Sequence, residues 1–197
     1  MPLTPSTMLD LGTKMPEFSL MATDGMTVSS SDLKGSKAAL LIFISNHCPY
    51  VQHIRAGLAQ FGRDYQGSGL RMVAINANDI TSHPADSPER MKEEVEQQGY
   101  VFPYLFDIDQ SVAKACQAAC TPDIFLFDAG ESLVYRGQFD DSRPGNGVPV
   151  TGNDLRAAVD AILSGRMVGS DQVPSVGCNI KWRPGNEPAY INVPAKN

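Results

Sequence analysis

Cysteines carry the strongest chemical signal in this sequence of 197 residues, which contains four of them. Cys48 follows a continuous apolar run over residues 38–44 and directly precedes Pro49, a residue type that is tolerated at the first position of a helix. Cys48 is therefore expected at a helix N-terminus, where unpaired backbone N–H groups and the helix dipole favour a thiolate over a thiol. Because the thiolate is the reactive form, Cys48 is the candidate nucleophile.

Polar residues surround this cysteine. Ser45, Asn46 and His47 separate it from the apolar run, which predicts an exposed corner. His47 has two open interpretations: it holds the thiolate or passes a proton, or it is a solvated loop residue. Cys48 and His53 could nominally ligate a metal, but no second cysteine pair with zinc spacing accompanies them. We expect neither a metal nor an organic cofactor.

An oxidised Cys48 needs a second thiol to resolve it. Cys178 lies on a C-terminal segment that could fold back to the corner, although a free structural cysteine is an equal alternative. Cys116 lies in an alanine-rich stretch that predicts a helix, which favours a packing role.

The elements that must position these residues follow an α/β pattern. Apolar runs at 38–44 and 70–76 predict strands covered on both faces, and the segment from Pro49 to about Tyr65 has helical apolar spacing. The remaining expected elements are a hairpin over 18–28, a helix from Pro88 stopped by Gly99, a strand over 104–106, a helix from Asp109 through Ala119, strands over 124–127 and 133–139, and a helix from Asn153 closed by Gly165.

This order indicates an α/β fold with a central mixed sheet, helices on both faces and one antiparallel edge. Residues 1–165 are expected to form one domain. Residues 166–197 contain four prolines and the only tryptophan, and they are expected to form a long irregular tail packed on that domain.

Composition excludes several classes of protein. The net charge is −6 without a cluster of Lys or Arg, which argues against a nucleic-acid partner. No apolar run approaches the roughly 20 residues that cross a bilayer, so no membrane association is expected. The first residues lack the pattern of a secretory signal, and four cysteines are too few for a disulfide-stapled scaffold, so a cytoplasmic location is predicted.

Several separated motifs between about Met15 and Pro188 resemble the redoxin branch of the thioredoxin-fold proteins (alkyl hydroperoxide reductase/thiol-specific antioxidant). The segment FISNHCPYV at 43–51 resembles the active-site corner, and Thr121-Pro122 resembles the cis-proline loop. Together with stretches at 120–123, 140–144 and 178–182, the chain looks most like the uncharacterised peroxiredoxin-like members. The resemblance implies a thioredoxin fold with an N-terminal hairpin extension and thiol chemistry, and it places Cys120 near the corner.

The chain also departs from its relatives. Val51 stands where thioredoxins have the second cysteine of Cys-x-x-Cys, so the corner cannot close its own disulfide. Ser45 can stand in for the threonine of the peroxiredoxin corner, but Leu41 replaces its proline. Pro122 occupies the place of the peroxiredoxin arginine, and Arg143 on the loop 140–152 is a candidate substitute.

The sequence thus predicts a thiol oxidoreductase that reduces a peroxide or a disulfide, with electrons from an external thiol donor of the thioredoxin or glutathione type. The rival hypothesis is a non-catalytic redox-sensing or binding module of the same fold. The oligomeric state stays open, as does the choice between Cys120 and Cys178 as resolving thiol. The residues expected at the site are Cys48, Cys120, Pro122 and Cys178, supported by Ser45, Asn46, His47, Pro49 and Arg143.

Overall fold

A mixed sheet forms the centre of the computed structural model, which describes residues 3–192. Its seven strands lie in the order β3-β2-β6-β5-β4-β8-β9. Their bounds are β2 Ser19–Ala22, β3 Thr27–Ser29, β4 Ala38–Phe43, β5 Leu70–Asn76, β6 Tyr104–Phe106, β8 Asp123–Asp128 and β9 Leu133–Tyr135. Strand β4 pairs parallel with β5 and antiparallel with β8, so the sheet is mixed as the sequence predicts.

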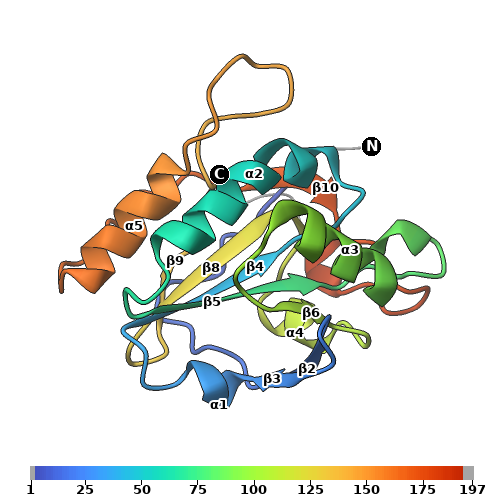
Figure 1. The fold of residues 1–197 in the computed structure, drawn as a ribbon, viewed down its shortest axis with the longest axis horizontal. Helices are drawn as coiled ribbons and strands as arrows, with labels where there is room; N and C mark the ends of the chain where they lie inside the picture. The colour runs from blue at the N-terminus through green and yellow to red at the C-terminus, as the bar shows by residue number, and fades with distance from the viewer. Residues whose placement is uncertain (1–2, 193–197) are drawn as a thin grey trace.

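Helices cover both faces of this sheet (Figure 1). On one face lie α2 (Pro49–Asp64), α3 (Pro88–Gln98) and α5 (Asn153–Leu163), whose apolar residues pack with Leu40 and Ile42. On the other lie α1 (Ser30–Leu33) and α4 (Ser111–Ala115), whose apolar residues pack with Leu41 and Phe43. All six residues of β4 are buried, because successive side chains enter opposite hydrophobic clusters.

Helix α2 is the element that carries the candidate nucleophile. Pro49 is its first residue and Cys48 its N-cap, as the sequence predicts. Val51, Ile54 and Leu58 recur at helical spacing and turn one face of α2 toward the sheet. This packing fixes the N-terminus of α2 at the carboxyl end of β4.

The expected helix from Asp109 through Ala119 is shorter in the structure. Only Ser111–Ala115 is α-helical, because Gln110 and Gln117 take left-handed backbone conformations with φ of 62° and 49°. Similarly, the strand expected over 133–139 ends at Tyr135.

The C-terminal segment, which the sequence predicts as irregular, contains one strand, β10 (Val176–Asn179). Strand β10 lies between β1 (Leu3–Pro5) and β7 (Cys120–Thr121) in a second, three-stranded sheet. Two short 3₁₀ helices at Pro84–Asp86 and Ala189–Asn192 complete the described elements. The small sheet joins the two ends of the described chain to the cis-proline loop.

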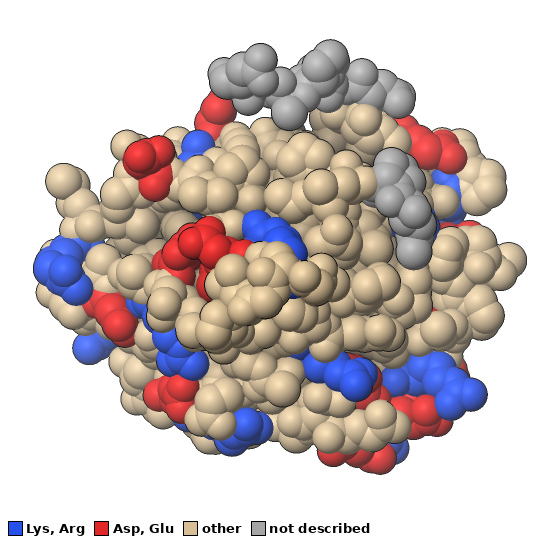
Figure 2. Space-filling model, turned by 90° about the horizontal axis from the view of Figure 1, so that it is seen from above, with Lys and Arg blue, Asp and Glu red and all other residues tan. Residues whose placement is uncertain are grey.

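Charge is distributed without segregation on the face seen in Figure 2, where Lys and Arg side chains alternate with Asp and Glu. Within residues 3–192, no helix has the length and apolarity that a membrane span requires.

Candidate functional site

Cys48 lies at the carboxyl end of β4, but it is not at an exposed corner. Its side chain is fully buried, so the prediction of exposure is wrong. The cause is the approach of β7 and β10 from distant parts of the chain. The Cys48 thiol donates a hydrogen bond to the backbone oxygen of Thr121, with 3.1 Å between Sγ and O.

Cys178 is the thiol that the fold brings to Cys48. In the antiparallel pairing of β10 with β7, Cys178 lies directly opposite Thr121, the residue whose carbonyl accepts from Cys48. Burial raises the pKa of Cys178 to about 12, and a hydrogen bond with the Cys48 side chain adds to the rise. Cys48 and Cys178 also belong to the same buried hydrophobic cluster, so the two thiols lie together beside the Thr121 carbonyl.

Cys120 is close to this pair but differently oriented. Its thiol is fully buried and points toward the carbonyl oxygens of Pro122 and Ser175, at 3.5 and 4.0 Å. Burial raises its pKa well above the ordinary value, nearby Asp123 adds to the rise, and Arg143 opposes it. Cys116 packs in the hydrophobic cluster on the opposite face of the sheet, away from the cluster that holds Cys48 and Cys178.

The Thr121–Pro122 peptide bond is cis, as the resemblance to the cis-proline loop implies. Pro122 links β7 to β8, so the carbonyl that accepts from Cys48 belongs to the residue just before this proline. The loop is thereby held against the N-terminus of α2.

Asp86 anchors the polar residues that precede Cys48. Its buried carboxylate accepts from the Asn46 backbone N–H at 2.7 Å and from the Asn78 amide at 2.8 Å. The His47 Nδ1 atom lies 2.6 Å from the same carboxylate. Burial opposes ionisation of Asp86, but hydrogen bonds from His47 and Asn78 outweigh it and hold the pKa of Asp86 below its ordinary value. His47 is thus bound to Asp86 rather than solvated.

The remaining predicted residues lie around this centre. The Ser45 hydroxyl is buried and has no hydrogen-bond partner among the described residues. Arg143 donates to the backbone oxygens of Asp140 and Ser142, both at 2.7 Å. With Tyr50 and Pro122, Arg143 lines a cavity of about 20 Å³, which has room for one water-sized molecule.

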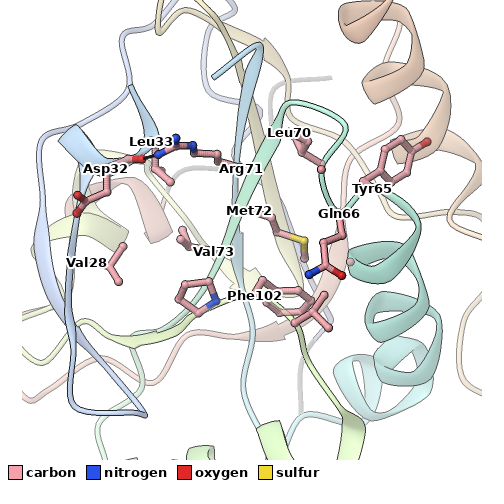
Figure 3. Close-up of a pocket in the computed structure, with 14 residues that line it drawn as sticks. Val28, Asp32, Leu33, Tyr65, Gln66, Leu70, Arg71, Met72, Val73 and Phe102 are labelled. Atoms are coloured by element: carbon pink, nitrogen blue, oxygen red, sulfur yellow. Dashed lines mark hydrogen bonds between the residues drawn. The ribbon is translucent and has the colours of Figure 1, made fainter. Parts of the chain in front are cut away.

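A larger pocket of about 350 Å³ lies elsewhere (Figure 3). It is lined by apolar side chains such as Leu33 and Phe102, and Arg71 crosses it to the backbone oxygen of Asp32. Tyr65, at the C-terminal end of α2, borders it. Cys48 caps the other end of that helix, about 26 Å away at 1.5 Å per residue. The pocket therefore does not belong to the thiol site.

Within the described residues 3–192, no group of three or more His, Cys, Asp or Glu side chains is arranged to hold a metal ion. Cys48 and His53 thus stand without further ligands in the part of the chain that the structure describes.

Three residues of the site escape sequence reasoning. The Thr121 carbonyl is a backbone group and carries no signature of its own. Asp86 ends a short 3₁₀ helix that carries no recognisable motif, 38 positions from Cys48. Gly177 precedes Cys178 in β10, and a glycine inside a strand is a usable signal, since it often marks a close approach of two backbones.

The order of the central strands, the helices on both faces and the cis-proline loop opposite Cys48 define a thioredoxin-fold protein. A solved structure from Chlorobium tepidum, described as "a putative Thiol:disulfide interchange protein DsbE", shares this fold with a TM-score of 0.62 and 24% identity. The alignment covers 79% of this chain and 99% of that one.

Residues 11–136 match the AhpC/TSA family, and the chain belongs to that family. It is 28% identical over 113 residues to a Mycobacterium tuberculosis protein named "Putative peroxiredoxin Rv2521", which covers 57% of this chain and 67% of that protein. A "hypothetical protein" from Sinorhizobium meliloti 1021 has a solved structure with 56% identity and a TM-score of 0.90, covering 91% of this chain and 98% of that one. Family and fold together support a thiol-dependent redox function.

Proposed function

We propose that this protein is a thiol oxidoreductase in which Cys48 and Cys178 alternate between two thiols and one disulfide while a peroxide or a disulfide is reduced. The observation that carries the proposal is the position of Cys178 opposite Thr121, whose carbonyl accepts from the Cys48 thiol in the same buried cluster. Two thiols in contact need only a small movement to form a bond.

The order of events follows from the different surroundings of the two thiols. Cys178 has a pKa raised to about 12, so it remains a neutral thiol near pH 7 and is a weak nucleophile. Cys48 is at the N-terminus of α2, where the helix dipole favours negative charge. Cys48 therefore attacks first, and Cys178 resolves the product.

With a peroxide, the Cys48 thiolate attacks one oxygen, the S–O bond forms and the O–O bond breaks. The leaving alkoxide or hydroxide takes up a proton, which leaves a sulfenic acid on Cys48. Cys178 then attacks that sulfur, the disulfide forms, and water leaves. An external dithiol of the thioredoxin type, or two glutathione molecules, returns two electrons and two protons. With a disulfide substrate, the first product is a mixed disulfide, which Cys178 resolves with release of a thiol.

The other residues support this cycle. Asp86 fixes Asn46 and His47 and thus the approach to Cys48, Pro49 begins the helix, and Ser45 adds a free hydroxyl near the corner. Pro122 and Arg143 border the small cavity that Val176 of β10 also lines. Cys120 is the less favoured resolving thiol, since its sulfur points toward backbone carbonyls rather than toward Cys48. The need for thiol reductants agrees with the predicted cytoplasmic location.

The test is oxidation of the reduced protein with one equivalent of hydrogen peroxide, followed by a non-reducing peptide map and a turnover assay with a thioredoxin-type donor. We expect a Cys48–Cys178 disulfide and multiple turnovers. Cys48→Ser should abolish both, Cys178→Ser should stop at oxidised Cys48, and Cys116→Ser, in the opposite hydrophobic cluster, should behave as the wild type.

Other results would contradict the proposal in distinct ways. A Cys48–Cys120 disulfide would transfer the resolving role to Cys120. A single stoichiometric oxidation in place of multiple turnovers would favour the redox-sensing module over the enzyme.

A further inference from the structure

Gly177 allows an unusually close approach between two strands at the thiol pair. It lies in β10 between Val176 and Cys178, where β10 runs antiparallel to β7. A Cβ atom added to Gly177 would lie 2.0 Å from the Thr121 carbonyl oxygen and 2.7 Å from the Thr121 carbonyl carbon. Non-bonded carbon contacts have their optimum at about 3.5–4.0 Å, so a side chain at this position would overlap the backbone of β7.

The requirement at this position is space rather than backbone freedom. Gly177 does not have a positive φ, unlike Gly165 and Gly185. Its backbone conformation is therefore open to any residue type. The obstructing atoms belong to the backbone, which cannot rotate away as the end of a flexible side chain can. An alanine must therefore displace either the Thr121 carbonyl or strand β10.

Either displacement acts on the proposed redox pair. The Thr121 carbonyl is the acceptor for the Cys48 thiol, and the next residue after Gly177 is Cys178. Moving the carbonyl takes the hydrogen-bonded Cys48 thiol with it and so changes its distance from Cys178. Moving β10 carries Cys178 away from Cys48.

We infer that Gly177 is a positioning residue that sets the distance between the Cys178 and Cys48 sulfur atoms. This inference rests on the proposed cycle, in which Cys178 attacks the oxidised Cys48 sulfur. A misplacement of about 1 Å of reacting groups can slow a step about a hundredfold. Closure of the disulfide should therefore depend on the absence of a side chain at residue 177.

The experiment compares the full-length wild type with Gly177→Ala and Gly169→Ala. Gly169 lies in the same C-terminal segment and has no positive φ, and a Cβ atom added to it would meet no heavy atom within 4 Å, so it is the matched control. Each reduced protein is oxidised with hydrogen peroxide in the presence of dimedone, which traps sulfenic acid. Mass spectrometry then gives the fractions of Cys48–Cys178 disulfide and of dimedone-labelled Cys48 over time.

We expect disulfide closure about a hundredfold slower in Gly177→Ala, with dimedone-labelled Cys48 accumulating in its place. Gly169→Ala should close at the wild-type rate. The rate of initial Cys48 oxidation in Gly177→Ala/Cys178→Ser should match the rate in Cys178→Ser alone, because the effect of Gly177 acts on the distance to Cys178. A purely structural role of Gly177 would slow the initial oxidation of Cys48 as well as the closure of the disulfide.

Closure in Gly177→Ala within twofold of the wild type would overturn the inference, and so would a slower oxidation in the double variant. If Gly177→Ala is unfolded by circular dichroism, the measurement is repeated in trimethylamine N-oxide, which favours the folded state. A chain that stays unfolded there also overturns the inference, because Gly177 then serves folding as a whole. Failure of the wild type itself to form the disulfide would instead refute the proposed function.

Discussion

At the scale of single residues, the site depends on groups that hold Cys48 from two sides. The Thr121 carbonyl accepts from its thiol, and Asp86 binds the two residues before it. Asp86 is fully buried and its carboxylate is the common acceptor of that loop. A buried acceptor with several donors contributes more than a surface ion pair, because its removal leaves each donor unpaired.

We predict that Asp86→Ala lowers the free energy of unfolding at pH 7 by about 3 kcal/mol, since it leaves the partly buried donors of Asn46 and His47 and the buried Asn78 amide without their acceptor. Urea denaturation followed by fluorescence measures this. Glu96→Ala, an exposed carboxylate on α3, serves as the control and should change little. A loss in Asp86→Ala no larger than in the control would show that the anchor is dispensable.

The lowered pKa of Asp86 predicts how its contribution to stability changes with pH. Its folded pKa is below the unfolded value, so its contribution is present above the ordinary carboxyl pKa of 3.8 and is lost as the pH falls through the folded pKa. The difference between wild type and Asp86→Ala should therefore shrink in acid.

The placement of Cys48 could be predicted from the sequence because its causes are local. An apolar run, a polar break and Pro49 suffice to place a cysteine between a strand and a helix. Its burial and its contact with Cys178 could not be predicted without the resemblance or the structure, since both depend on where a distant strand docks. Periodicity carries no information about such a contact.

At the scale of elements, helix α4 is shorter than the alanine content of its segment predicts, and side chains around it determine where it begins and ends. Gln110 and Gln117 leave the helical region at its two sides. Asp107 accepts from the backbone N–H groups of Val112 at 3.4 Å and Ala113 at 2.8 Å, which fixes the first turn. Propensity predicts the longer helix, whereas the buried carboxylate and the following β7 strand determine the observed one.

Asp107 should make the stability of the fold depend on pH. Burial raises its pKa to about 6, against the opposing backbone hydrogen bonds from Ala113 and Val112. The folded pKa exceeds the unfolded value, so between about pH 4 and 6 the folded state binds more protons and loses stability as the pH rises. Two pKa units correspond to about 3 kcal/mol.

We predict that the difference in unfolding free energy between wild type and Asp107→Asn changes by about 3 kcal/mol from pH 4 to pH 7, in favour of the variant at the higher pH. Denaturation curves at several pH values check this. Asp123, whose pKa burial also raises to about 6, is present in both proteins and cancels. For Asp171→Asn, at an exposed position, the difference in unfolding free energy from the wild type should not change with pH. A difference for Asp107→Asn that is equally independent of pH would contradict the prediction.

At the scale of the whole molecule, the C-terminal segment belongs to both hydrophobic clusters. Cys178 packs with the helices on one face of the sheet, whereas Ile180 packs on the other. The sequence predicts a domain over 1–165 with a packed tail, and the pairing of β10 with β7 and β1 supports one cooperative unit. The α/β order was predictable from alternating apolar runs and caps, but the three-stranded sheet was not, because its strands are short and come from three distant segments.

Cooperativity of the tail can be tested with two substitutions in it. Ile180 is 1% exposed and Met167 is 95% exposed. Ile180→Ala should lower the free energy of unfolding by about 3 kcal/mol, whereas Met167→Ala should stay within about 0.5 kcal/mol of the wild type. Circular dichroism and tryptophan fluorescence should give coincident transitions in both. Separate transitions for the two probes would mean that the tail unfolds independently.

In the proposed redox cycle, burial of the Cys48–Cys178 pair should also limit the rate at which a protein partner reduces the disulfide. A partner of protein size reaches a Cys48–Cys178 disulfide only after β10 separates from β7, to which two residue pairs join it. The rate of disulfide reduction should then rise with partner concentration and level off at the rate at which β10 separates from β7, whatever the partner's intrinsic reactivity. Strand β10 would thus restrict reduction by a protein partner to the pace of the protein's own fluctuations.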